Sequence, residues 1–155
     1  MAKEEKKSRW PRIKNKKAFH DYEILDKIEA GLELKGSEVK SLRKGSADLN
    51  AAYARIYNNE CFLIGCKIEP YKEATYNNHD PERKRKLLLH KAQIKRLHTK
   101  LEQKGYSLIP LAIYFNDRGT AKLELALARG KKKYDKRAAI KEKDLKRDMQ
   151  RYAKY

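Results

Sequence analysis

Apolar and polar residues alternate along short runs in the middle of the chain, a pattern that predicts antiparallel β-strands joined by tight turns. The paired runs lie at residues 22–28 and 32–34, 53–57 and 60–64, and 108–115 and 121–128. Gly31 permits the first turn, Asn58 and Asn59 tolerate the positive φ angles of the second, and residues 116–119 supply the third. The sequence therefore predicts three hairpins, the last strand placing three leucines on one face: Leu123, Leu125 and Leu127.

Two segments between the hairpins carry helix signals. Ser37 can cap a short helix, Glu38 suits its positive end, and Gly45 can close it. A second helix is predicted where Ile94, Leu97 and Leu101 recur at helical spacing, up to Gly105. Three hairpins with two to three short helices predict a mainly β fold, a small antiparallel barrel of the oligonucleotide-binding (OB) type; an open α+β sheet is the alternative.

Charge divides the chain into three parts. The 155 residues carry 39 Lys and Arg against 21 Asp and Glu, a net charge of +18. Residues 1–17 hold 8 basic and 2 acidic side chains, and residues 131–155 hold 11 and 4. We therefore expect a basic N-terminal arm (1–17), a barrel domain (18–130) and a basic C-terminal tail (131–155). Such arms are either solvated solubility tails or phosphate-binding segments, and two of them on one small body favour RNA.

The C-terminal tail combines positive charge with aromatic and apolar residues. Tyr134 lies among lysines and an arginine, a grouping that can neutralise phosphates and stack on a base. Leu145, Met149 and Tyr152 follow at helical steps and would form a weak apolar stripe. We expect this tail to be disordered when free and to become helical on binding RNA.

Other classes of protein find little support. The chain has no nucleotide-binding or hydrolase motif, and its histidines and two cysteines lack metal-ligand spacing, so we expect no catalysis, metal or cofactor. The weaker alternative is a nuclease using the acidic cluster around His20 and Asp21. Cys61 and Cys66 are interpreted as buried thiols. With no long apolar window and no secretory signal, we expect a cytoplasmic protein without membrane contact.

Several motifs together resemble one known family. They are Asn15-Lys-Lys-Ala-Phe-His20-Asp-Tyr22, Glu29-Ala-Gly31, Gly36-Ser-Glu38-Val-Lys40-Ser-Leu-Arg43, His79-Asp-Pro81, Arg85-Lys-Leu-Leu-Leu89 and Ala128-Arg-Gly130-Lys-Lys-Lys-Tyr-Asp-Lys-Arg137. From about Asn15 to Arg147 the chain resembles small protein B (SmpB), the family that binds transfer-messenger RNA (tmRNA) in trans-translation. The resemblance implies an OB-type barrel without catalytic activity, which binds the tRNA-like domain of tmRNA and delivers it to stalled bacterial ribosomes.

The resemblance also implies partners and residue roles. The partners would be tmRNA, the small ribosomal subunit with its 16S rRNA and, indirectly, elongation factor Tu and alanyl-tmRNA; we expect no DNA and a monomeric protein. The expected tmRNA contacts are Asn15, Glu29 and Leu88, with Lys16, Lys17, Arg43 and Lys86 at phosphates. The expected decoding-centre and messenger-channel residues, in which the tail stands in for the missing codon, are His20, Lys131, Lys132, Lys133, Tyr134, Asp135, Lys136, Arg137, Ile140, Lys141 and Lys143.

Alternatives to these roles come from the residues themselves. Glu29 is also typical of a hairpin residue, Leu88 of a core leucine and His20 of a solvent-facing histidine before a strand. At the level of the whole protein, the alternative is a ribosomal or ribosome-assembly protein that binds rRNA.

Overall fold

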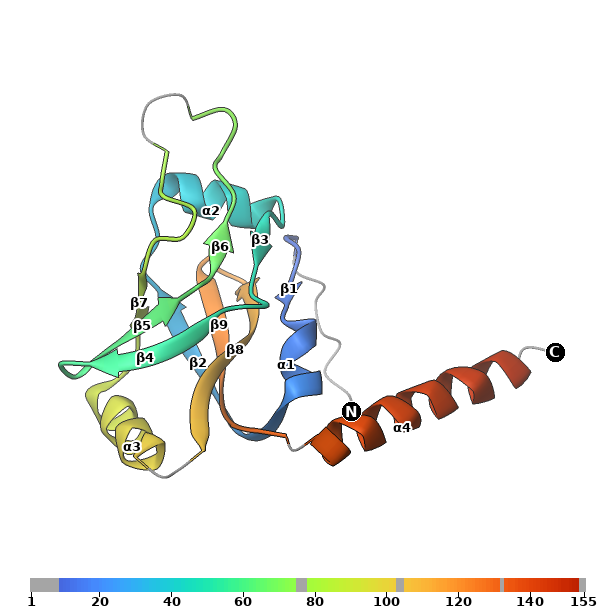
Figure 1. Cartoon of the computed structure of the whole chain (residues 1–155). Coiled ribbons are helices and arrows are strands. Elements are labelled where there is room, and N and C mark those ends of the chain that lie inside the picture. Colours follow the sequence, from blue (N-terminus) through green and yellow to red (C-terminus); the bar gives the residue numbers. More distant parts are fainter. Residues whose placement is uncertain (1–8, 75–77, 103–104, 132, 154–155) are drawn as a thin grey trace.

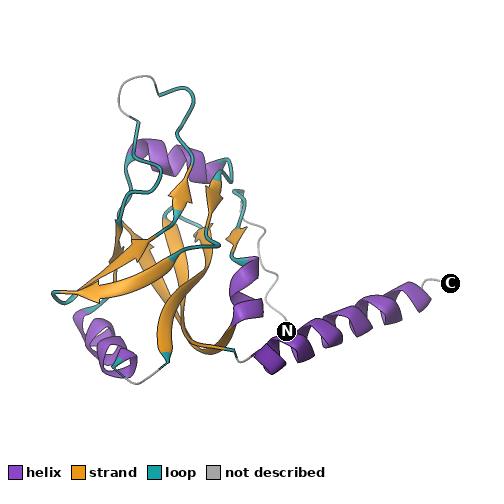
Figure 2. Cartoon of the chain, viewed as in Figure 1, coloured by secondary structure: helices purple, strands orange, loops and turns teal. Residues whose placement is uncertain are grey.

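Antiparallel strands form the body of the protein in the computed structural model, which describes residues 9–74, 78–102, 105–131 and 133–153 (Figures 1 and 2). The strands are β1 (Ile13–Lys14), β2 (Tyr22–Leu32), β3 (Ala47–Asp48), β4 (Tyr53–Tyr57), β5 (Glu60–Ile64), β6 (Lys67–Ile68), β7 (Arg85–Leu88), β8 (Tyr106–Phe115) and β9 (Ala121–Gly130). The helices are α1 (Lys16–Asp21), α2 (Gly36–Arg43), α3 (Lys91–Leu101) and α4 (Lys133–Tyr152).

Six of these strands pair in a ring. The neighbours run β8, β4, β5, β7, β2 and β9, and β9 pairs back onto β8. The junction between β4 and β8 has the fewest paired residues, because it consists of one pair, Ala54 opposite Leu108. A ring of this size leaves few strand edges exposed. The predicted mainly β, antiparallel fold is thereby confirmed.

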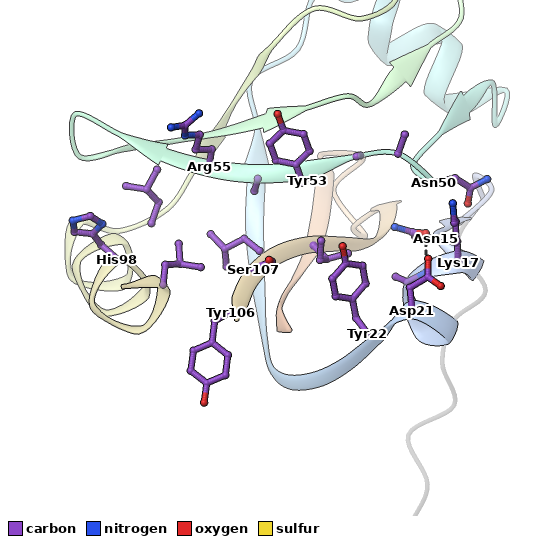
Figure 3. Close-up of a pocket in the computed structure, with 18 of the residues that line it drawn as sticks. Asn15, Lys17, Asp21, Tyr22, Asn50, Tyr53, Arg55, His98, Tyr106 and Ser107 are labelled. Carbon is purple, nitrogen blue, oxygen red and sulfur yellow. Dashed lines mark hydrogen bonds between the residues drawn. The ribbon is translucent and has the colours of Figure 1, made fainter. Parts of the chain in front are cut away.

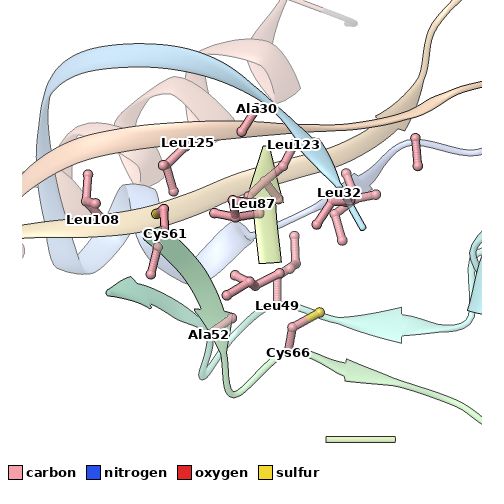
Figure 4. Packing of buried hydrophobic residues seen from close by; sticks show 14 of the residues in the cluster. Ala30, Leu32, Leu49, Ala52, Cys61, Cys66, Leu87, Leu108, Leu123 and Leu125 are labelled. Atoms are coloured by element: carbon pink, nitrogen blue, oxygen red, sulfur yellow. The ribbon is translucent and has the colours of Figure 1, made fainter. Parts of the chain in front are cut away.

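One core fills the inside of the ring (Figure 4). The three leucines predicted to share a face of the last strand, Leu123, Leu125 and Leu127, are all buried there. The opposite face of the same hairpin is also covered, because α1 places Ala18 against Ala126 and Ala128 in a second cluster. The β8–β9 hairpin is therefore sandwiched between the barrel interior and α1.

Two of the three predicted hairpins are confirmed. The β4–β5 turn has positive φ angles at Asn58 (48°) and Asn59 (60°). The β8–β9 turn has Gly119 at φ 77°. Both turns use residues that tolerate the left-handed region, so local chemistry was enough to place them.

The first predicted hairpin is wrong, since residues 22–32 form one continuous strand, β2. Gly31 lies opposite Leu88 of β7, and a Cβ atom added at Gly31 would lie 3.1 Å from the Leu88 Cβ. The glycine thus provides room for a neighbouring side chain rather than a turn.

Helices α1 and α2 and strand β7 also differ from the predictions. Helix α2 begins at Gly36. The Glu38 carboxylate caps its first turn by accepting a hydrogen bond from the Lys35 backbone N–H at 3.0 Å. The prediction that Ser37 is the cap is therefore wrong. Strand β7 was not predicted, because its charged residues hid the alternation. Helix α1 was not predicted either, since only one of its six residues is buried.

Strand β1 and helix α1 also extend the folded body into residues 13–17, which the charge analysis assigned to the N-terminal arm. At the other end, α4 projects away from the barrel (Figure 1). The structure therefore gives the tail in its helical form; that it becomes helical only on binding stays a prediction.

A buried ionic network connects α2 to the start of β7 and the residues just before it. Glu38 and Arg85 are both fully buried and form an ion pair, while Arg83 donates to the same carboxylate at 2.6 Å. Burial alone would raise the pKa of Glu38, but the Lys35 backbone and both guanidinium groups outweigh it, so the pKa is lowered. Glu38 and Arg85, which both occur in the motifs quoted above, therefore stabilise the packing of α2 against β7.

His79 extends this network on the same side. It is 4% exposed, its Nε2 donates to the Ile68 carbonyl at 2.9 Å, and its Nδ1 shares a hydrogen bond of 2.8 Å with the Ser37 hydroxyl. Because both ring nitrogens are used, the loop before β7 is fixed to β6 and α2.

Candidate RNA-binding surfaces

Strand register brings distant candidate residues onto one outer face of the barrel. Leu88 of β7 pairs with Gly31 of β2, which pairs with Lys122 of β9, which pairs with Tyr114 of β8. In the adjacent row Glu29 pairs with Glu124, Glu124 with Ala112, and Ala112 with Lys14 of β1. Directly paired residues point to the same side of a sheet. We call this surface the Glu29 face; its members are Arg12, Lys14, Lys27, Glu29, Lys86, Leu88, Tyr114, Lys122 and Glu124.

Glu29 is exposed but held in place. Its carboxylate accepts a hydrogen bond from the Tyr114 hydroxyl, and the pKa of Tyr114 is raised by burial and then by this bond. The Arg12 guanidinium lies 4.8 Å from the centre of the Tyr114 ring and donates to Glu124 at 2.6 Å. One carboxylate of this face is thus neutralised by arginine, whereas Glu29 is oriented by a neutral hydroxyl and keeps acceptor capacity for a ligand.

Leu88 is the apolar member of the face. Its side chain is 53% exposed, which rules out the core-leucine interpretation, and it lies over Gly31. Lys86, two residues earlier on the same side of β7, forms an ion pair with Glu60 at 3.3 Å. A hollow of about 450 Å³ lies beside them, between β7 and the start of α3. An exposed leucine beside a hollow offers an apolar contact for an unstacked base.

Asn15 does not share this exposure, being 1% exposed and acting as the N-cap of α1. Its side-chain oxygen accepts from the Ala18 backbone N–H at 3.1 Å, while its amide donates to the Leu49 carbonyl at 3.2 Å and the Pro110 carbonyl at 2.8 Å. Leu49 lies in the segment before β4 and Pro110 belongs to β8, so Asn15 connects that segment to β8 close to the single β4–β8 residue pair. Its side chain has no exposed surface left for RNA.

A groove of about 650 Å³ opens beside this bridge, between α1, β4, β8 and α3 (Figure 3). Tyr22 points toward β4 across it, Tyr53 lines its edge on β4, and Lys17 and Asp21 of α1 lie at one end with His98 of α3 at the other (Figure 3). Of the residues predicted to bind RNA, this groove includes Asn15 and Lys17. None of its lining residues belongs to the Glu29 face, so the two surfaces are distinct.

The remaining predicted phosphate contacts lie at the ends of two helices. Lys16 and Lys17 are exposed on α1, directly after β1. Arg43 ends α2 and lies 5.0 Å from the Trp10 ring centre and 5.8 Å from that of Phe115. Trp10 packs against the core, and its ring faces the Arg43 guanidinium, which it helps to hold in place.

The first of the residues expected to contact the ribosome, His20, lies in the last turn of α1. His20 is exposed, and its Nδ1 lies 2.9 Å from the Asp21 carboxylate. Arg137, Ile140, Lys141 and Lys143 are exposed along α4. Lys132 lies outside the described residues, as do the side chains of Lys133, Tyr134, Asp135 and Lys136, so their predicted roles stay predictions.

Sequence reasoning missed part of the Glu29 face. The strand pairings place Tyr114 and Lys122 on the same face as Glu29, although Tyr114 is 85 residues away along the chain, and Arg12 joins them through its contact with the Tyr114 ring. A basic or aromatic residue on a strand has no local signal that identifies its neighbour. The alternation around Tyr114 was the one indication that its side chain points outward.

Two features are absent from the described part of the chain. No group of three or more His, Cys, Asp or Glu side chains there is arranged to hold a metal ion. None of the helices in these residues is both long and apolar enough to cross a membrane.

A small antiparallel barrel with a polar outer face, flanked by basic segments, is typical of nucleic-acid-binding proteins. Comparisons with known proteins identify the particular family. The SmpB protein family matches residues 12–155, and the chain belongs to it.

Individual relatives are similar over most of their length. The chain is 57% identical to an SsrA-binding protein of Syntrophobacter fumaroxidans, over 90% of this chain and 86% of the relative. It is 50% identical to an SsrA-binding protein of Staphylococcus carnosus, over 99% and 98%. A chain of a solved structure described as "tmRNA-SmpB: a journey to the center of the bacterial ribosome" is 55% identical, with a TM-score of 0.68, covering 79% of this chain and 86% of that one.

Proposed function

We propose that this protein binds the tRNA-like domain of tmRNA through the Glu29 face and delivers it to bacterial ribosomes stalled without a codon. One observation carries the proposal: an oriented carboxylate and an exposed leucine share a face with several cations. The family membership and the similarity to a chain solved with tmRNA support it. The protein would act as a monomer in the cytoplasm, without catalysis, with elongation factor Tu meeting it through alanyl-tmRNA.

The members of the Glu29 face would have separate tasks. Lysines and Arg12 attract phosphates without reading sequence. The Glu29 carboxylate repels phosphate but can accept hydrogen bonds from base amino groups, and Leu88 can pack against a base that has left its stack. Recognition of an RNA loop would then rest on Glu29 and Leu88, and the attraction on the cations.

Asn15 contributes to this function in an indirect way. Because its side chain is buried and bonded, we place it as a support for α1, which presents Lys16 and Lys17, instead of as an RNA contact. Lys16 and Lys17 are proposed phosphate contacts at the edge of the RNA-binding surface.

Salt dependence of binding separates these tasks. Dissociation constants for the tRNA-like domain would be measured at several salt concentrations for Glu29→Gln, Leu88→Ala and Lys122→Met. We expect Glu29→Gln and Leu88→Ala to weaken binding by roughly 5- to 150-fold without changing the salt slope. Lys122→Met should reduce the slope by about 0.7 to 0.9. The same slope change in all three variants would contradict the division of labour.

The tail would enter the empty messenger-RNA channel of the small subunit and stand in for the missing codon, with His20 and Tyr134 near decoding bases. Truncation after Lys131 should leave the affinity for the tRNA-like domain nearly intact and abolish peptide tagging on stalled ribosomes. A parallel loss of affinity and tagging would contradict this separation of body and tail.

Sequencing of RNA crosslinked to the protein in cells tests the function as a whole. Enrichment of one tRNA-like species supports the proposal. Recovery of bulk rRNA alone would favour the alternative, a ribosomal or ribosome-assembly protein.

A further inference from the structure

The junction between the barrel and α4 is fastened to α1 at consecutive residues. Gly130, the last residue of β9, pairs with Tyr22 at the start of β2. The backbone N–H of Lys131 donates to the Asp21 carbonyl at 2.9 Å, and its ammonium donates to the Phe19 carbonyl at 3.0 Å. The chain therefore leaves the sheet and is immediately bonded to the last turn of α1.

Helix α1 is itself rigidly held, so it can serve as a fixed base for these bonds. Asn15 caps its N-terminus and is hydrogen-bonded to the segment before β4 and to β8. Ala18, 2% exposed, packs against Ala126 and Ala128 of β9. The C-terminal end continues directly into β2. A six-residue helix would not persist in water alone, but these contacts fix it to the body.

The position of the Lys131 ammonium is electrostatically favourable. The last carbonyls of a helix lack partners within the helix and carry partial negative charge. The Phe19 carbonyl is one of them, and a lysine that bonds it satisfies both the hydrogen bond and the charge. Nearby, the Asp21 carboxylate faces His20 at 2.9 Å. Lys131 is only partly exposed, unlike Arg137 or Lys141 further along the tail.

We infer that Lys131 is a positioning residue, which fixes the direction in which α4 leaves the barrel by fastening the tail to α1. Lys131 was predicted to lie in the messenger channel as one of several tail cations, and its two bonds to α1 support this further role. The same short helix presents Lys16 and Lys17 at one end and holds the tail at the other, so the tail would keep a set direction relative to RNA on the body. The consequence for tagging rests on the proposed function, whereas the direction of α4 does not.

A matched pair of variants tests this inference. Lys131→Met removes the ammonium and keeps most of the side-chain length, and Lys141→Met removes one exposed tail cation that forms no such bond with α1. Lys131→Arg keeps the charge and the donor. Each is made in the full-length protein that carries Tyr57→Cys at the end of β4 and Gln150→Cys on α4, both exposed positions. Spin labels attach there, because the native cysteines are buried.

The distance distribution between the two labels is the first readout. We expect Lys131→Met to broaden it clearly, Lys141→Met to leave it unchanged and Lys131→Arg to restore it. Equal widths for Lys131→Met and the unmutated Lys131 protein, or equal broadening in both Met variants, would overturn the inference.

Peptide tagging on stalled ribosomes is the second readout. Lys131→Met should lower tagging by roughly tenfold, as expected for loss of one charge-assisted hydrogen bond, and more than Lys141→Met does. Affinity for the isolated tRNA-like domain should be unchanged in both. Equal tagging by the two Met variants would overturn the role in tail placement. Failure of the unmutated protein to support tagging would instead contradict the proposed function, while the distance measurement would still test the junction.

Discussion

Replacing Glu38 with alanine removes the central anion of a buried network. The carboxylate is fully buried and accepts from Arg85, Arg83 and the Lys35 backbone N–H, so its removal leaves the fully buried Arg85 charge without a counter-ion. Breaking a buried ion pair in this way costs about 3–5 kcal/mol. For a chain of 155 residues this corresponds to a fall in Tm of roughly 6–20 °C.

Chemical denaturation and thermal melting followed by circular dichroism measure this loss. Glu102→Ala is the control, because its pair with His98 is exposed at 3.5 Å and should contribute almost nothing. Replacing both members, Glu38→Leu with Arg85→Met, should recover much of the stability, since no buried charge is then left unpaired. Two results would refute the reasoning. One is a loss of unfolding free energy in Glu38→Ala as small as that in Glu102→Ala. The other is a double variant whose loss equals the sum of the losses in Glu38→Leu and Arg85→Met.

The pH dependence of stability provides a second check on the same residue. Because the pKa of Glu38 is lowered in the folded state, its stabilisation is complete above the unfolded-state pKa of about 4.3 and is lost as pH falls through the folded-state pKa. The stability gap between the unmutated protein and Glu38→Gln should therefore narrow in acid. A gap that stays constant from pH 6 to pH 3 would contradict the lowered pKa.

Three further predictions follow from local geometry. Gly65→Ala should destabilise the protein by more than about 1 kcal/mol, because φ is +76° and the new Cβ would lie 2.8 Å from the Ala51 carbonyl oxygen. Gly36→Ala is the control, since a Cβ there meets open space and should not destabilise the protein; denaturant titration compares the two variants. Gly31→Ala should displace Leu88 across a 3.1 Å contact and weaken RNA binding, and unchanged affinity would count against Leu88 as a contact. Burial raises the pKa values of the two cysteines to about 11, so they should react with a thiol reagent at pH 8 only as fast as the protein opens. Labelling at the rate of an exposed thiol would contradict their burial.

The hairpins at Asn58 and Gly119 could be predicted from the sequence, since a residue that tolerates positive φ acts locally and needs no distant partner. The basic tails and the alternation of the last strand are local in the same sense. Gly31 misled the prediction because the identical residue also serves close packing, and only the neighbour, Leu88 of β7, distinguishes the two uses.

Strand β7 shows why other elements escaped prediction. Arg85 occupies an inward position of this strand, and a charged residue there contradicts the usual alternation of strands. Its burial is explained by Glu38, 47 residues away, and no local pattern carries that information.

For the candidate site, the sequence and the family motifs together named Glu29, Leu88 and Asn15 as one group, but tertiary structure assigned them different surroundings. Sheet register placed Glu29 and Leu88 on one exposed face and added Tyr114 beside them. The narrow β4–β8 junction buried Asn15 instead. Residue type, local turn preference and charge are properties of the chain itself, whereas which side chains meet and which are covered depends on pairings between strands far apart in sequence, and these exist only once the ring of strands has closed.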